Sequence, residues 1–128
     1  MLGSFQKSQL RIELATSELV LRDSLTRPQQ LQQWLWPQRL SAGLPEQFSV
    51  GLVYTSSFGP VTVQHRVDVI ENHCLRLILS QGIDGFHEWY WGEGWVQSRL
   101  EGVSLLPLNL LQTLSLLRLR QFLTSQTS

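Results

Sequence analysis

The sequence has little cysteine and no excess of charge of either sign. Cys74 is the one cysteine among 128 residues, so the chain can form neither an internal disulfide nor a cysteine metal cluster, which indicates a reducing compartment. Ten basic side chains balance ten acidic ones, which excludes a disordered acidic tail, a polybasic arm and a surface that attracts nucleic acid. We therefore expect no nucleic-acid partner, and we assign no cofactor.

The chain also lacks long apolar runs. No segment reaches the roughly 20 apolar residues of a membrane span, and residues 1–7 contain no apolar stretch of signal-peptide length. Apolar residues still make up 42% of the sequence, enough for a core in a chain of this length. These features predict a cytoplasmic protein with no integral membrane segment, folded as one domain over residues 1–128.

The pattern of side chains changes along the chain. Residues 5–14 alternate apolar and polar side chains, as a half-buried strand does. Two short helices are predicted next, capped by Ser17 and Thr26 and ended at Pro37. Residues 48–103 then form a succession of alternating segments, separated by turns so short that they can only join antiparallel neighbours.

The last segment is rich in leucine. From residue 107 to residue 123 it contains no glycine, and leucines occupy most of its helical circumference. This pattern predicts one long helix that is buried on most of its sides, followed by a frayed polar tail at 124–128.

This order of elements predicts an α+β fold in which a curved antiparallel sheet wraps around the long C-terminal helix. The order, the exit Trp34-Leu35-Trp36-Pro37 from the second helix and the leucine-rich terminal helix resemble the START-like, or helix-grip, superfamily. That superfamily includes lipid-transfer domains, polyketide cyclases and aromatases, and plant hormone-binding and pathogenesis-related proteins. The resemblance covers nearly the whole chain. It implies a cavity for a small apolar molecule between sheet and helix, although the loops at the mouth are short here.

The first two turns of the meander predict which strand residues face one another. A two-residue turn at 59–60 sets His65 opposite Tyr54. A three-residue turn at 71–73 then sets His65 opposite Leu79. All three side chains should therefore share one face of the sheet.

The next two loops complete the predicted register. The loop at 83–84 sets Leu79 opposite Glu88, and a three-residue turn at 92–94 sets Glu88 opposite Ser98. Apolar side chains fall together on the same face, which we take as the concave one. One row across that face reads Tyr54, His65, Leu79, Glu88 and Ser98.

The same register gathers Trp89, Trp91 and Trp95 beside Arg99 on the convex face. Three exposed indoles, on the order of 200 Å² each, would form a larger apolar patch than monomers usually expose. We predict that a partner covers the patch, and a homodimer is the simplest partner. The alternative is that the N-terminal segment, a loop or arginine stems cover the indoles within one chain.

Tyr54, His65 and Glu88 of the concave row could carry acid–base chemistry, because burial in an apolar pocket raises the pKa of a carboxyl group. Adjacent strands lie about 4.8 Å apart, so Tyr54 and His65 can touch, whereas His65 and Glu88 stand about 10 Å apart. In the alternative interpretation Tyr54 and His65 satisfy one another, and Glu88 binds a buried water or Arg118. Arg118 falls among the helix leucines, and its head points either toward this row or to solvent.

Other motifs give no support to metal or nucleophilic chemistry. His87-Glu88 begins like a zinc-protease sequence but lacks the second histidine, so no metal site is assigned. Cys74 has no assured basic partner.

The leading hypothesis is a protein that binds a small apolar or amphipathic molecule in a cavity between sheet and helix, with the polar row fixing its polar end. A cavity of several hundred Å³ would support it. One alternative is a polyketide cyclase-like enzyme with His65 or Glu88 as acid or base, and another is an interaction module built on the convex tryptophans. The predicted ligand-binding residues are Tyr54, His65, Leu77, Leu79, Glu88, Tyr90, Ser98, Leu111, Leu114 and Arg118.

Overall fold

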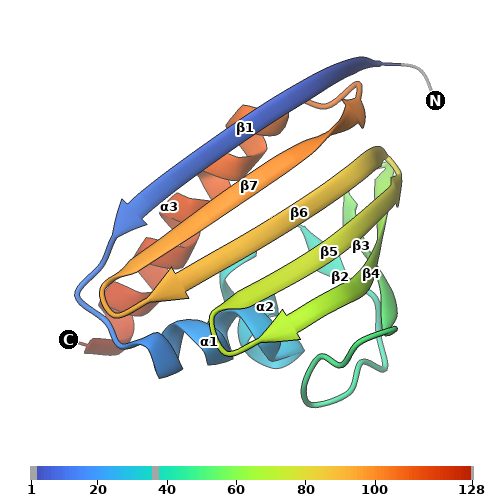
Figure 1. The fold of residues 1–128 in the computed structure, drawn as a ribbon. Coiled ribbons are helices and arrows are strands. Elements are labelled where there is room, and N and C mark those ends of the chain that lie inside the picture. Colours follow the sequence, from blue (N-terminus) through green and yellow to red (C-terminus); the bar gives the residue numbers. More distant parts are fainter. Residues whose placement is uncertain (1–2, 36–37, 128) are drawn as a thin grey trace.

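The computed structural model describes residues 3–35 and 38–127 (Figure 1). Its core element is a seven-stranded antiparallel sheet with the order β1-β7-β6-β5-β4-β3-β2. The strands are β1 (Ser4–Glu13), β2 (Arg39–Leu40), β3 (Val53–Phe58), β4 (Val61–Glu71), β5 (Cys74–Gln81), β6 (Ile83–Gly92) and β7 (Trp95–Ser104). The helices are α1 (Glu18–Thr26), α2 (Pro28–Trp34) and α3 (Leu108–Thr127). This is the predicted α+β helix-grip fold. Trp36 and Pro37, part of the predicted helix exit, lie outside the described residues.

Different helices cover different parts of the sheet. Helix α3 packs along β1 and β7, α1 contacts β6, and α2 contacts both α3 and β2. Figure 1 shows the sheet curving over all three helices. The space between α2, α3 and the middle strands is therefore where a ligand cavity could form.

Local sequence sets the ends of the short helices. Ser17 Oγ accepts a hydrogen bond from the Val20 N–H at 3.2 Å and caps α1 as predicted. Thr26 ends α1 instead of capping α2, and α2 begins directly at Pro28, whose missing N–H costs nothing in a first turn. Helix α3 runs to Thr127, past the predicted end at residue 123.

Helix α3 buries one side only. Leu110, Leu114 and Leu117 are 54%, 42% and 47% exposed. The prediction of burial on most sides is wrong, because β1, β7 and α2 together cover a single face of this helix. The buried residues of that face are Leu108, Gln112, Leu116, Leu119 and Leu123.

The predicted register is confirmed across β3, β4 and β5. His65 pairs with Tyr54 on one side and with Leu79 on the other. The turn between β4 and β5 is one residue shorter than predicted, because Glu71 pairs with Cys74. A β-bulge between Val67 and Val69 compensates for that difference and restores the predicted pairing.

The predicted register of β6 is wrong. Leu79 lies opposite Gly85 and not opposite the predicted Glu88, a shift of three residues. Glu88 lies opposite Arg99 and not opposite the predicted Ser98, a shift of one residue. A register shift by an odd number of residues moves every side chain of a strand to the other face of the sheet. The shift between β5 and β6 therefore reverses β6, and the second shift, between β6 and β7, returns the side chains of β7 to the predicted face.

Two glycines explain where the register changes. The last hairpin turn contains two residues rather than three, with Gly94 at a positive φ of 78°. Gly85 packs so close to β7 that a Cβ there would lie 1.9 Å from the Glu101 carbonyl oxygen. Gly85 is therefore a strand residue at a close approach of two backbones, not part of a loop.

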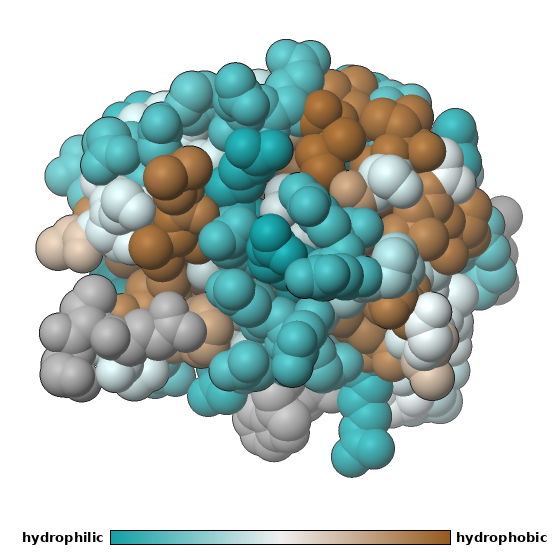
Figure 2. Space-filling view, turned by 90° about the horizontal axis from the view of Figure 1, so that it is seen from below, coloured by the Kyte–Doolittle hydropathy of each residue, from teal (hydrophilic) through white to brown (hydrophobic). Residues whose placement is uncertain are grey.

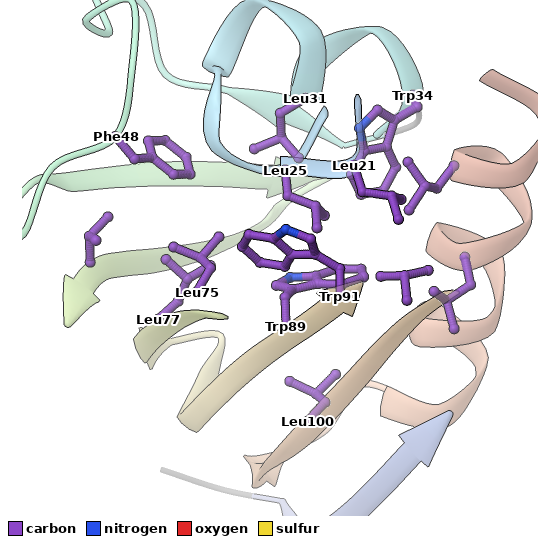
Figure 3. Packing of buried hydrophobic residues seen from close by; sticks show 14 of the residues in the cluster. Leu21, Leu25, Leu31, Trp34, Phe48, Leu75, Leu77, Trp89, Trp91 and Leu100 are labelled. Carbon is purple, nitrogen blue, oxygen red and sulfur yellow. The ribbon is translucent and has the colours of Figure 1, made fainter. Parts of the chain in front are cut away.

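The flipped strand carries tryptophans into the core. Trp89 is 4% exposed and Trp91 is 1% exposed, and Figure 3 shows both indoles pointing from β6 toward Leu25 of α1. Trp34 meets Trp89 edge-to-face at 6.0 Å between ring centroids. The predicted convex tryptophan patch is therefore wrong for Trp89 and Trp91.

Trp95 does lie on the convex face, but it is only half-buried and is partnered within the chain. The Arg11 guanidinium stands 4.4 Å from the centre of its ring. An arginine stem thus covers this indole, as the single-chain alternative supposed.

The underside of the molecule is mixed in character (Figure 2). Polar side chains occupy much of its middle, and hydrophobic side chains gather on the side where the loop between β2 and β3 lies. In and beside that loop, Val50 and Val53 are 65% and 47% exposed. Within the described residues, no helix combines the length and apolar character that crossing a membrane requires.

Candidate functional site

A cavity lies between the concave face of the sheet and the helices. Its volume is about 80 Å³. Most of its wall is apolar, and none of the described lining residues carries a charged side chain. The polar members of the wall are Gln38, Tyr54, Ser56, His65, His87, Gln112 and Ser115.

The cavity is smaller than the several hundred Å³ anticipated from the sequence. A cavity of about 80 Å³ admits only a small molecule without rearrangement. The flipped register explains the difference, because the indole of Trp89 stands in the wall where a smaller Glu88 carboxylate was predicted.

One polar end of the cavity is a stack of rings on β3 and β4. The Tyr54 ring lies 4.6 Å from the His65 ring and nearly parallel to it, and Phe48 stacks on the other side of Tyr54 at 5.0 Å. His65 Nε2 lies 2.8 Å from Ser56 Oγ. Its Nδ1 is buried and has no hydrogen-bond partner among the described residues. Tyr54 and His65 therefore touch as predicted, but by stacking, and a serine binds the imidazole.

The other polar end is His87 on β6. His87 Nε2 lies 2.7 Å from Ser98 Oγ on β7, and the imidazole packs against Trp89 at 4.7 Å. Gln112 of α3 donates from Nε2 to Ser98 Oγ at 2.9 Å, so a side chain of the helix also binds this serine. The group ties β6, β7 and α3 together at the cavity wall.

Burial keeps the titratable groups of the cavity neutral at pH 7. It lowers the pKa of His65 to about 4. It also lowers the pKa of His87 to about 3, with a smaller contribution from the charge of His65. Burial raises the pKa of the Tyr54 hydroxyl above its usual value. The cavity thus offers neutral hydrogen-bonding groups rather than charges.

The structure brings about half of the predicted ligand-binding residues together. Ser98 stands directly behind His87 through their hydrogen bond. Leu114 is instead exposed on the outer side of α3, and Arg118 is not part of the wall; its Nη1 donates to Gln121 Oε1 at 3.2 Å. The predicted residues that line the cavity are Tyr54, His65, Leu77, Leu79 and Leu111.

Glu88 and Tyr90 lie on the convex face, contrary to the prediction. Glu88 pairs with Arg76 at 3.1 Å and Arg99 at 3.6 Å, not with Arg118. The Tyr90 hydroxyl donates to Glu88 at 3.3 Å. Glu88 therefore cannot act as acid or base in the cavity, and Arg99 belongs to an ion cluster rather than to a tryptophan interface.

Sequence reasoning missed His87, Ser56 and Gln112. The alternation of His87 with Trp89 places both on one face of the strand, but it does not show which face is buried. Gln112 had a signal too, because it is a polar residue within the leucine arc of the helix. Ser56 had none, since serine is common on either face of a strand.

No group of three or more His, Cys, Asp or Glu side chains is placed to hold a metal ion in the part of the chain that the structure describes. Each cavity histidine is already bonded to a serine. The arrangement can hold an uncharged molecule by apolar contact and a few hydrogen bonds.

Comparisons with known proteins identify the fold. No family model matches the chain, and no curated protein matches it in sequence. The structure of DynU16, a protein in the dynemicin biosynthetic locus, matches with a TM-score of 0.70 and 16% identity over 94% of this chain, which spans 48% of DynU16. MLL2253 from Mesorhizobium loti matches with a TM-score of 0.70 and 14% identity, covering 94% of this chain and 98% of that one. Major latex-like protein 151 from Panax ginseng matches with a TM-score of 0.65 and 12% identity, covering 97% and 98% of the two chains. At these identities the likeness shows a shared helix-grip fold.

Proposed function

We propose that this protein binds a small apolar or amphipathic molecule in the cavity between the curved sheet and the helices. The observation that carries the proposal is the composition of the wall: apolar side chains surround a few neutral polar groups, and no described lining residue is charged. Binding sites for small molecules have this character. The small volume of the cavity limits the size of the ligand, so a larger ligand requires α2 and α3 to move apart.

We further infer that residues 1–128 form one START-like domain that acts in the cytoplasm. The match of its fold to solved structures over nearly the whole chain supports the domain assignment. The assignment to the cytoplasm rests on the lone cysteine and the lack of apolar runs in the sequence.

A second candidate function is catalysis by His65. The contact of 2.8 Å between Ser56 Oγ and His65 Nε2, inside the cavity, favours it. The low pKa of about 4 opposes it, because an imidazole with such a pKa accepts a proton weakly. Chemical conversion of a retained ligand by the wild type and not by a His65→Phe variant would favour catalysis over binding.

A homodimer requires a surface other than the tryptophans. The exposed leucines 110, 114 and 117 lie along one side of α3 and offer such a surface. Sedimentation at micromolar concentration tests it: self-association that Leu114→Glu abolishes would support the dimer, and a wild-type monomer would exclude it.

Native mass spectrometry of protein purified from its own host tests the binding proposal. Leu111 lines the cavity and Leu114 faces outward on the same helix, which makes them a matched pair. We expect a small molecule to remain bound to the wild type and to a Leu114→Trp variant, and to be lost from Leu111→Trp, whose larger side chain fills the space. Equal retention by both variants would contradict binding in the cavity.

A further inference from the structure

A chain of hydrogen bonds lies behind the cavity, and the orientation of the Gln112 amide determines which group donates at each step. Gln112 Nε2 lies 2.8 Å from the Ser98 carbonyl oxygen and 3.2 Å from the Ser8 carbonyl oxygen. Carbonyl oxygens only accept hydrogen bonds, so the amide nitrogen must face them. The orientation of the Gln112 side chain is thereby fixed.

The fixed amide sets the proton of Ser8. Gln112 Oε1 faces Ser8 Oγ, and an amide oxygen only accepts, so the Ser8 hydroxyl donates to it. Asn109 Nδ2 donates to Ser8 Oγ at 2.8 Å and satisfies this oxygen as an acceptor. The hydrogen bonds therefore run from Asn109 through Ser8 to Gln112.

The same reasoning sets the proton of Ser98. Its Oγ lies 2.9 Å from Gln112 Nε2, which cannot accept, and 2.7 Å from His87 Nε2. Within the described chain, His87 Nε2 is thus the acceptor available to the buried Ser98 hydroxyl, which would otherwise remain unsatisfied. A neutral imidazole that accepts at Nε2 carries its proton on Nδ1.

The Nδ1–H of His87 is then a donor at the cavity wall. His87 lines the cavity; the protein shields it from bulk water, which lowers its pKa, yet its side chain keeps some accessible surface. Its Nδ1 makes no hydrogen bond to any described residue, and it is not one of the fully buried polar atoms that lack a partner. This nitrogen is therefore accessible. A polar group left open in an apolar cavity favours a ligand that satisfies it.

We propose that the cavity selects an uncharged molecule whose apolar body fills it and whose carbonyl or ether oxygen accepts a hydrogen bond from His87 Nδ1–H. This inference rests on the proposed binding function and names the chemical class of the ligand. Charged molecules are disfavoured because no ionised side chain among the described lining residues would compensate their desolvation. Burial holds the pKa of His87 near 3, so the imidazole stays a neutral donor and gives an anion no counter-charge at pH 7.

Two probes of the same shape test the inference. Cyclohexanone and methylenecyclohexane are small rings of nearly the same size and shape, and they differ in that the ketone carries an oxygen where the alkene carries a CH₂ group. Dissociation constants measured by NMR titration give the ratio of ketone to alkene affinity for wild type, His87→Phe and His65→Phe. The two probes differ in hydration, but this difference is the same for every protein and cancels when the ratio of a variant is compared with that of the wild type. What remains is the contribution of the hydrogen bond.

We expect His87→Phe to lower the ketone-to-alkene ratio by about three- to tenfold, the range for one net hydrogen bond. His65→Phe, altered at the other cavity histidine, should change the ratio by less than about twofold. Cyclohexanecarboxylate should bind the wild type at least about tenfold more weakly than cyclohexanone. If the alkene binds and His87→Phe leaves the ratio unchanged, the inference is wrong and the binding function stands. If neither neutral probe binds, both are wrong.

A direct measurement of the proton position keeps the inference testable should His87→Phe fail to fold. Long-range ¹H–¹⁵N correlation of the imidazole distinguishes the two neutral forms. We expect His87 of the wild type to be protonated at Nδ1, and a Ser98→Ala variant to lose this preference because the hydroxyl donor is gone. Protonation of wild-type His87 at Nε2 would overturn the inference.

Discussion

His87 and Ser98 lie on neighbouring strands two pairing positions apart, since His87 pairs with Leu100 while Ser98 pairs with Trp89. This diagonal relationship on the concave face brings the imidazole Nε2 within 2.7 Å of the serine hydroxyl. Gln112 then connects the pair to α3. The polar end of the cavity is therefore held by a strand pair and a helix, rather than by loops.

Replacement of Gln112 tests the structural part of this network. Gln112→Leu removes hydrogen bonds to the Ser8 and Ser98 carbonyls and takes away the acceptor of the buried Ser8 hydroxyl, so we expect the free energy of unfolding to fall by about 2–3 kcal/mol. Urea denaturation measures the change. The control Gln121→Leu, at an exposed site on the same helix, should stay within about 0.5 kcal/mol of the wild type. Equal effects at both positions would contradict the network.

The positions of the tryptophans can be distinguished by stability. Trp91→Ala empties a fully buried site and should cost about 3–5 kcal/mol of unfolding free energy. Trp95→Ala removes a half-buried indole that stacks with Arg11 and should cost about 1 kcal/mol. Thermal and urea unfolding give both values. Equally small losses for both variants would return β6 to the register predicted from the turns, which places both indoles on the convex face.

Stability should decrease as the solution becomes acidic. The pKa values of His65 and His87 fall from 6.5 to about 4 and about 3 on folding, so below pH 6.5 the unfolded chain binds protons that the folded chain does not. The free energy of unfolding should therefore fall between pH 6.5 and 4, by up to about 1.4 kcal/mol per pH unit for each histidine.

Urea titrations at pH 7, 6 and 5.5 measure this slope. His65→Phe and His87→Phe should each flatten it, whereas Gln121→Leu, altered at an exposed residue that does not titrate, serves as the control and should retain the wild-type slope. A slope that persists in both cavity variants would show that other groups bind the protons.

Glu88 should affect stability without affecting the cavity. Its carboxylate is nearly buried between Arg76 and Arg99 on the convex face, so Glu88→Gln should cost about 1–3 kcal/mol of unfolding free energy. The affinity for cyclohexanone should be unchanged. Glu46→Gln, at an exposed ion pair with Arg27, should change neither quantity measurably. Loss of cyclohexanone binding in Glu88→Gln would contradict the placement of this residue outside the cavity.

Sequence patterns predicted the α+β architecture and the pairing of β3 with β4, because the two-residue turn at Gly59 and Pro60 admits one register. The pairing of β4 with β5 agrees at His65 because a β-bulge offsets a turn that is one residue shorter than predicted. They failed at β6 for a physical reason. Phe86 and Tyr90 on one face are as apolar as Trp89 and Trp91 on the other, so burial does not select a face from the sequence. The glycines around β6 allow turns of different lengths, and a change of one residue reverses every side chain.

Whether a site residue was predicted correctly depended on whether the register of its strand was. Tyr54 and His65 were placed correctly because their hairpin was, and Glu88 was misplaced with its strand. His87 became visible as a wall of the cavity only once contacts between β5, β6 and β7 fixed the face. Long-range pairing of this kind is decided by packing, which single-strand patterns do not contain.

Titration of methyl-labelled protein with methylenecyclohexane is the most direct test of ligand binding in the cavity. We expect shifts for the methyl groups of Leu77, Leu79 and Leu111, which line the cavity, and none for those of Leu110 and Leu117 on the outer side of α3. A saturating titration that leaves the three cavity leucines unchanged, or shifts only the two outer ones, would contradict it.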